Sequence, residues 1–257
     1  DFRAIDGKLV YGLGAIKNVG SEAVSNLIKE RKKNGKFKSL MDFIKRANPK
    51  DINKLQLEGL VKSGAFDKLE INRKGIFSSI PKLIQLNKVL YEDKVSKQSN
   101  LFDNDENTNN EKFKLITDEK WDKKELLSEE FKSLGFYISD HPLNNFKSIF
   151  PQLNIKPYKD YIVDQNNEGM IAGTLMTIQE KKSSKGTPFA IAKFSDNFGE
   201  YELFIFSEIL VKNREILKEG ESFVMTLFKD VSNDQKRVNV RKIVLLDSLI
   251  NNSYKKV

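Results

Sequence analysis

Few side chains in this sequence are of the types that catalyse reactions. The 257 residues include a single histidine, His141, and no cysteine, which excludes disulfides, thiolate zinc sites and His-rich metal sites. Asp164, Asp196 and Asp234 are isolated at expected strand ends or turns, so they do not form a carboxylate set for two-metal phosphoryl transfer. His141 lacks an evident carboxylate or nucleophile partner in the sequence and is expected to be structural. We therefore predict no catalytic residue and no metal ligand.

A short polar stretch points to binding instead. Between Ser96 and Lys112, Leu101 and Phe102 are the only apolar side chains. A stretch this polar cannot bury enough surface to offset the cost of ordering it, so we expect it to be mobile and to leave the pair available to a partner. The alternative is that the pair folds back onto its own domain. The predicted ligand peptide offers one amide and two apolar anchors, and it consists of Gln98, Ser99, Asn100, Leu101 and Phe102.

Positive and negative charges are distributed unevenly along the chain. The net charge is +8, and residues 1–100 carry 21 Lys and Arg against 11 Asp and Glu, whereas residues 101–140 carry 6 against 11. This basic first part favours contacts with phosphates, although a solvated lysine-rich surface is the alternative. The sequence has neither an initiator Met, nor a signal-peptide pattern, nor the roughly 20 apolar residues that span a bilayer. We expect an excised internal fragment, located in the cytoplasm, with no membrane contact.

Helix signals and glycine turns organise the first part. Helices are expected over residues 21–33, from Ser39 to the break at Asn48-Pro49, over residues 51–63 and over residues 73–90. Glycine turns join them, and such turns let the backbone approach a phosphate while the N–H groups of the next helix point at it. Asn in place of glycine tolerates the left-handed conformation that the first turn needs. Helix packing is the alternative role, above all for the second turn. The predicted DNA-backbone contacts are Lys17, Asn18, Val19 and Gly20 in the first turn and Ser63 and Gly64 in the second.

The last third of the chain has the pattern of a β-barrel. Five strand-like runs cover residues 169–178, 188–194, 200–206, 222–228 and 236–244, with a helix over about 207–217. A helix between the third and fourth of five strands is the order of an OB-fold. The predicted contacts with single-stranded nucleic acid are Lys181, Lys182, Lys185, Lys236, Arg237 and Arg241. Candidate stacking rings are Phe189, Phe198, Tyr201 and Phe204, although most of them are needed to fill the barrel.

Three sequence blocks carry a resemblance to a known family. They are YGLGAIK at 11–17, LEGL leading to GAFD at 57–67, and LGFYISDHPL at 134–143. In this order they resemble the alpha subunit of bacterial DNA polymerase III, a C-family replicative DNA polymerase, over essentially the whole chain, as a C-terminal fragment. The resemblance implies that residues 98–102 bind the sliding clamp, that the first turn contacts duplex DNA, and that the OB domain lies near the single-stranded template.

The resemblance also implies where catalysis takes place. The family's metal-binding carboxylates belong to a palm domain upstream of residue 1, so the parent would be a magnesium-dependent DNA-directed DNA polymerase, a nucleotidyltransferase. This fragment would be non-catalytic and would bind no cofactor. Its partners would be primer-template duplex, single-stranded template and the sliding clamp, with other replicase subunits binding outside this chain. The alternatives are a helix-hairpin-helix and OB fragment of a DNA ligase or nuclease, or an RNA- or tRNA-binding OB module.

The expected fold class is α+β multidomain: an all-α tandem helix-hairpin-helix domain, a flexible linker, a short helical segment and a five-stranded OB-fold barrel. The predicted segments are the end of the fingers region (1–10), the helix-hairpin-helix DNA-binding domain (11–91), the polar linker with the clamp-binding peptide (92–115), a helical connector (116–166), the OB domain (167–250) and a tail (251–257).

Overall fold

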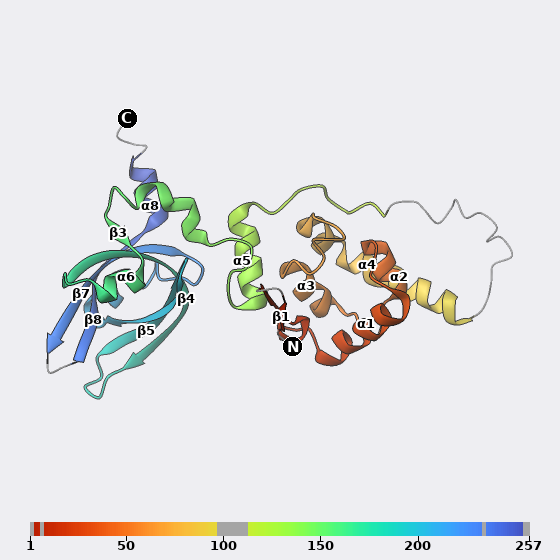
Figure 1. Ribbon diagram of the computed structural model, residues 1–257, viewed down its shortest axis with the longest axis horizontal. Helices are drawn as coiled ribbons and strands as arrows, with labels where there is room; N and C mark the ends of the chain where they lie inside the picture. Colours follow the sequence, from red (N-terminus) through yellow and green to blue (C-terminus); the bar gives the residue numbers. More distant parts are fainter. Residues whose placement is uncertain (1–2, 6–7, 97–112, 233–234, 254–257) are drawn as a thin grey trace. The chain divides into compact units, whose positions relative to one another are not determined.

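The chain divides into two compact units, residues 1–135 and 136–257. The computed structural model describes residues 3–5, 8–96, 113–232 and 235–253, and the side chains of residues 11–92, 113–230 and 238–249 (Figure 1). The clamp-binding peptide predicted at residues 98–102 lies outside the described residues. No helix in the described part is long and apolar enough to cross a membrane.

The first unit is mainly helical. After the antiparallel pair β1 (Arg3–Ile5) and β2 (Lys8–Val10) come η1 (Leu13–Ala15), α1 (Ser21–Asn34), α2 (Leu40–Arg46), α3 (Lys54–Lys62), α4 (Arg73–Ser96) and α5 (Lys123–Leu134). Helices α1 to α4 confirm the four predicted from sequence. Ser39 caps α2 as predicted, accepting from the Asp42 N–H at 3.1 Å. Helix α3 begins later than predicted because Asn53 and Gln56 form a capping box.

The core of the first unit lies between α2, α3 and α4. Phe43 of α2 is buried, and its ring contacts Phe37 and Phe66 edge to face, with centroids 5.2 and 5.0 Å apart. The buried Asn87 amide of α4 donates to the Ile44 and Ala47 carbonyls at 2.7 and 2.9 Å. These two bonds satisfy carbonyls that the end of α2 leaves without an intrahelical partner, and so fix α2 on α4.

Residues 113–135 complete this unit. The Ile116 N–H donates to Ser79 Oγ of α4 at 3.0 Å, and Trp121 packs on Phe77 with centroids 5.6 Å apart. Helix α5 is held by two ion pairs, Lys62–Glu129 at 2.9 Å and Arg73–Glu130 at 3.3 Å. The stretch predicted as a helical connector therefore contributes α5 to the first unit and its later residues to the second.

The second unit is a closed barrel with flanking helices. Its elements are η3 (Pro142–Ile149), β3 (Ile155–Lys156), α6 (Tyr158–Val163), β4 (Glu168–Lys182), β5 (Pro188–Asp196), β6 (Gly199–Phe206), α7 (Ser207–Asn213), β7 (Ser222–Ser232), β8 (Gln235–Leu245) and α8 (Leu246–Ser253). The strand order is β3-β4-β5-β6-β8-β7, and β4 also pairs with β7, which closes the barrel. This order, with β6 and β8 parallel, confirms the predicted OB-fold.

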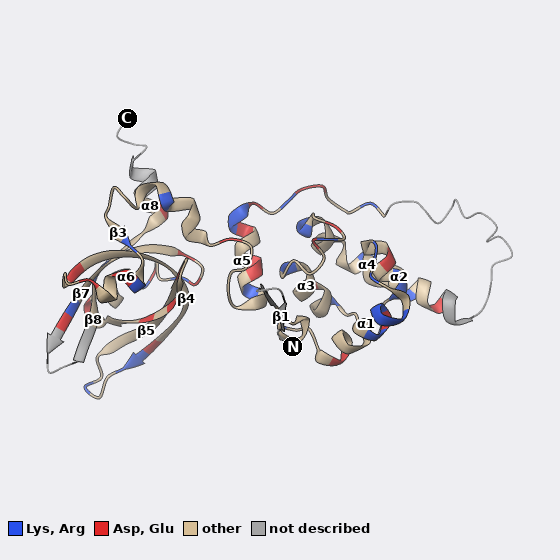
Figure 2. Ribbon diagram, viewed as in Figure 1, with Lys and Arg blue, Asp and Glu red and all other residues tan. Residues whose placement is uncertain are grey.

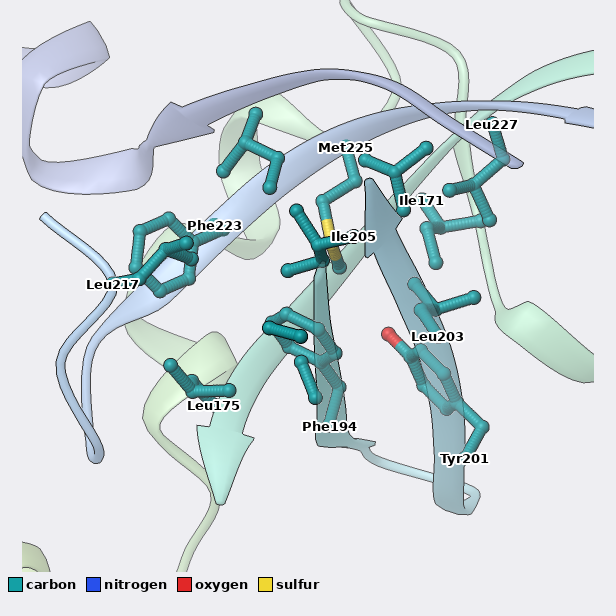
Figure 3. Close-up of a cluster of buried hydrophobic side chains, with 14 of the residues drawn as sticks. Ile171, Leu175, Phe194, Tyr201, Leu203, Ile205, Leu217, Phe223, Met225 and Leu227 are labelled. Carbon is teal, nitrogen blue, oxygen red and sulfur yellow. The ribbon is translucent and has the colours of Figure 1, made fainter. Parts of the chain in front are cut away.

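The long strand β4 makes closure possible. Its first half pairs with β7 through Thr174, and its second half pairs with β5, with a register shift between Leu175 and Thr177. The barrel is filled by apolar side chains that alternate inward along the strands (Figure 3). On β6, the inward residues are Tyr201, Leu203 and Ile205. The alternate residues of this strand therefore face outward, where a ligand can reach them.

Candidate nucleic-acid interface

The first hairpin, residues 17–20, is an exposed turn on a buried base. Lys17 and Asn18 are exposed, whereas Val19 is buried together with Ile16. Asn18 has φ 65°, the left-handed conformation predicted for it. Val19 can therefore offer only backbone groups to a ligand, and the exposed atoms of the turn come from its neighbours.

Two helices hold this hairpin in place. The Lys17 N–H donates to the Ser133 carbonyl of α5 at 3.0 Å. Gly59 of α3 lies directly against the Lys17 carbonyl, since a Cβ on Gly59 would come within 2.7 Å of that oxygen. A glycine is required here by close approach rather than by an unusual backbone conformation.

The N-terminus of α1 lies open beside the hairpin. Gly20 is the N-cap residue and makes no side-chain capping bond. The first-turn N–H groups of a helix lack intrahelical acceptors, and a glycine cap leaves them accessible to an anion such as a phosphate. Glu22 stands in the same turn and is exposed, so its carboxylate repels a phosphate that comes close to it.

The second hairpin is occupied by the protein itself. Gly64 has φ 77°, but a Cβ on it would lie 2.1 Å from Arg73 Nη2, because the guanidinium fills the space over the glycine. Arg73 also bonds Asp67 at 2.6 Å and Glu130 at 3.3 Å, and the Ser63 hydroxyl donates to the Leu60 carbonyl at 3.0 Å. Ser63 and Gly64 thus have the geometry of a packing turn. Their contact with DNA stays a prediction.

Exposed cations gather at the C-terminal end of α1 (Figure 2). Arg31, Lys32 and Lys33 lie in its last turn and are exposed, and within the described residues none of them forms an ion pair. Other cations of this unit serve its packing. Arg46 bonds Glu30 and Asp42, each at 3.0 Å. The last turn of α1 is thus a free basic surface.

A groove of about 810 Å³ crosses the outer face of β5, β6 and β8. Phe204 and Phe206 project from β6 with 45% and 52% of their surface exposed, and Phe189 of β5 stacks beside Phe204, with centroids 6.4 Å apart and planes at 27°. We name this the aromatic groove. It is lined by Tyr158, Ser183, Thr187, Pro188, Phe189, Glu202, Phe204, Phe206, Ser207, Glu208, Val238 and Asn239.

The β4–β5 hairpin brings positive charge to one end of this groove. Ser183 and Thr187 line the groove, and the same hairpin carries Lys181, Lys182 and Lys185, all exposed (Figure 2). We name these three residues the lysine hairpin. Aromatic rings with adjacent cations are the combination that single-stranded nucleic acid requires, because bases stack and phosphates are neutralised.

Comparison with known proteins agrees with this architecture. The helix-hairpin-helix motif family model matches residues 1–76. The chain is 33% identical to the DNA polymerase III subunit alpha of Caulobacter vibrioides over 226 residues, 86% of this chain and 20% of that protein. It is 37% identical to that of Rickettsia bellii over 86% of this chain, and 35% identical to that of Borreliella burgdorferi over 97%. The chain belongs to the DNA polymerase III alpha-subunit family. It spans about a fifth of the length of these curated relatives.

The remaining predicted contacts of this alpha-subunit segment lie in different surroundings. Tyr201, a candidate stacking ring, is buried, donates to the Ala172 carbonyl at 3.2 Å and stacks on Tyr158 with centroids 4.0 Å apart, so it belongs to the barrel core. Arg241 is exposed and lies over Phe228 at 4.6 Å, and it is not among the residues that line the groove. The side chains of Lys236 and Arg237 lie outside the described residues. Phe198 is exposed in the β5–β6 turn, with Lys159 Nζ 3.9 Å from its ring centroid.

Phe206 was missed by sequence reasoning, although a signal for it existed. Buried and exposed residues alternate strictly along the second part of strand β6, and its buried residues have odd numbers, as Leu203 does. Phe206 is two residues from Phe204, so it lies on the same face of the strand, and both rings project from the barrel. The same alternation places Tyr201 on the inner face, and it would have excluded this residue from the candidate stacking rings.

His141 has the contacts of a structural residue in this segment. Its Nδ1 accepts from the Leu143 N–H at 3.2 Å, capping η3, and its Nε2 lies 3.0 Å from Ser195 Oγ. Burial lowers the pKa of His141 to about 4, against the opposing charge of Asp196. Because Nδ1 accepts, the neutral ring carries its proton on Nε2 and donates it to the serine. It therefore cannot take the proton of Ser195 as a general base.

Carboxylates do not converge in the described part of the segment. Within that part, no group of three or more His, Cys, Asp or Glu side chains is arranged to hold a metal ion. Asp196 instead accepts from the Tyr158 N–H at 3.0 Å and from the Phe198 and Gly199 N–H groups at 2.8 and 3.0 Å. Its role is to shape the β5–β6 turn.

Proposed function

We propose that this chain is the DNA-handling and clamp-binding region of a replicative DNA polymerase. The parent would catalyse template-directed DNA synthesis in the cytoplasm, with magnesium at a palm site outside this chain. The chain itself would carry no catalytic centre and no cofactor. Membership of the alpha-subunit family supports the assignment to replication. The observation that carries the DNA-handling role is the aromatic groove with the lysine hairpin at one end.

The two units would take different forms of DNA. The first hairpin and the open N-terminus of α1 supply backbone groups and positive helix-dipole charge, which suit duplex phosphates without reading sequence. The exposed cations in the last turn of α1 add a long-range electrostatic attraction to DNA, which salt screens. The aromatic groove suits the single-stranded template, because stacking on Phe204 and Phe206 tolerates any base.

The third partner would be the sliding clamp. The peptide at residues 98–102 combines an amide with two apolar anchors, and in the sequence it lies after α4 and before α5. Its acidic neighbours Asp103, Asp105 and Glu106 disfavour DNA and favour a protein groove. Other replicase subunits would bind through regions outside this chain.

Salt dependence of single-strand binding tests the central part of this proposal. The affinity of the chain for a fluorescent oligonucleotide is measured at several salt concentrations, for the wild type and for a triple alanine variant of Lys181, Lys182 and Lys185. If each lysine neutralises one phosphate, the slope of log K against log salt falls by about 2, at about 0.7 per contact. A matched triple alanine variant replaces the exposed Lys147, Lys218 and Lys242, which do not line the groove.

The outcomes separate specific from general charge effects. The proposal requires wild-type binding that weakens with salt and a smaller slope for the lysine-hairpin variant alone. An affinity that is flat with salt, or an equal loss of slope in both variants, would contradict the proposed role of the hairpin.

A further inference from the structure

The aromatic groove contains a carboxylate that backbone binding does not explain. Glu202 precedes Phe204 by two residues on β6, so it projects from the same outer face, and it lines the groove. Its cross-strand neighbour Lys193 is paired with Glu200 at 2.5 Å. The other groove carboxylate, Glu208, is paired with Lys212 at 2.8 Å. Among the described residues, Glu202 forms no ion pair.

This distribution of charge orients a bound strand. A carboxylate repels phosphates, whereas the lysine hairpin attracts them, so the sugar-phosphate backbone should follow the hairpin side. The bases then lie over Phe204 and Phe206, and their hydrogen-bonding edges face Glu202. An ionised carboxylate can only accept hydrogen bonds, and it therefore distinguishes bases by the donors that they present.

Building on the proposed single-strand function, we infer that Glu202 gives the groove a preference for guanine. Guanine presents two adjacent donors, N1–H and N2–H₂, on its Watson–Crick edge, and these match the two carboxylate oxygens in a bidentate, charge-assisted pair. Adenine and cytosine present one amino group next to an acceptor nitrogen that repels the carboxylate. Thymine presents one imino N–H between two carbonyls.

The groove amide next to Phe204 does not oppose this preference. Asn239 lies beside Phe204 across the β6–β8 pair and lines the groove. Its amide both donates and accepts, so it can serve any base edge and discriminates little. Stacking on the phenylalanine rings is likewise tolerant of base identity. Specificity in this groove therefore rests on Glu202.

Single-base substitutions in an oligo-dT of about 12 nucleotides, within the range of one OB-fold site, test the inference with the full chain. The strands carry one central dT, dG or deoxyinosine, and inosine differs from guanosine only in lacking the N2 amino group. Affinities are measured for the wild type, for Glu202→Gln, and for Glu219→Gln, a matched removal of an exposed carboxylate outside the groove lining.

We expect the wild type to bind the dG strand about 5- to 10-fold more tightly than the all-dT strand, the lower part of the range for a bidentate base contact. Inosine should lose most of this gain, because one of the two donors is absent. Glu202→Gln should bring the dG-to-dT ratio to about 1 to 2, because the charge-assisted pair with guanine is lost, and should strengthen binding to the all-dT strand, because a charge that repels phosphates is removed. Glu219→Gln should keep the wild-type ratio.

The possible failures are distinguishable. A wild-type ratio near 1, or a preference that Glu202→Gln retains, overturns the inference while leaving single-strand binding intact. Failure of the wild type to bind any of the three strands overturns both the inference and the proposed function of the groove.

Discussion

Replacing Gly59 by alanine tests how the first hairpin is held. In a helix interior, alanine is more favourable than glycine by about 0.8 to 1 kcal/mol. The new Cβ would lie 2.7 Å from the Lys17 carbonyl oxygen and 3.1 Å from Val19 Cγ2. Overpacking against a fixed neighbour costs about 1 to 3 kcal/mol. The oxygen belongs to a backbone held on its other side by Ser133, so it cannot easily move away from the new methyl group. The cost of overpacking should therefore be larger than the gain in helix propensity, and the substitution should destabilise the first unit by about 1 kcal/mol.

The consequence for function is specific to duplex DNA. A displaced Lys17 carbonyl moves the hairpin and the start of α1, so affinity for duplex should fall several-fold while single-strand affinity stays unchanged. Urea denaturation followed by circular dichroism and fluorescence anisotropy measure the two effects. Gly14→Ala is the control, because a Cβ there meets nothing within 4 Å. A Gly59→Ala protein that gains stability and binds duplex normally would refute this account of the hairpin.

Three further changes probe the other features. Phe204→Ala should weaken single-strand binding by about 1 to 3 kcal/mol in a titration where Phe198→Ala, outside the groove lining, serves as control; equal losses would argue against the groove. Burial lowers the pKa of His141 to about 4 in the folded chain, against about 6.5 in the unfolded chain. The neutral histidine makes its full contribution to stability above about pH 6.5; below that pH the unfolded chain takes up a proton that the folded chain does not. The free energy of unfolding should therefore fall by about 1 kcal/mol between pH 7 and 5, allowing for partial solvation. An Asn at position 141, which can still cap η3, should flatten this slope in urea melts at both pH values, and an unchanged slope would exclude this histidine as its source. Replacing Leu101 and Phe102 by Ala should abolish binding in a sliding-clamp titration and leave the melting temperature nearly unchanged; a collapsed melt would place the pair in a core.

Local sequence signals predicted most of the elements. The five strand-like runs correspond to β4 to β8, because each run is long, rich in β-branched and aromatic residues and bounded by turn residues. The helix between the third and fourth runs was also predicted, although α7 ends at Asn213 rather than near residue 217. These features depend on neighbours within a few residues, and such neighbours are visible in the sequence.

Long-range packing was not predictable in the same way. The ion pair between Arg73 and Glu130 joins residues 57 positions apart, and the Arg73 guanidinium fills the space over Gly64, which gives this turn the geometry of a packing turn. The membership of α5 in the first unit also follows from such pairs. Neither residue type nor spacing specifies which guanidinium reaches which glycine.

The sequence by itself determined the order of the elements along the chain, including the helix between the third and fourth of five strands, the left-handed turn at Asn18 and the resemblance to the alpha-subunit family, because these depend on local propensity and on motifs read along the chain. Only the tertiary structure decided which side chains share a surface. It gathered Phe189, Phe204 and Phe206 into one groove, placed Glu202 among them, and withdrew Tyr201 into the core. Barrel closure and the register of the strands fix these neighbours, and both arise from contacts between residues distant in sequence.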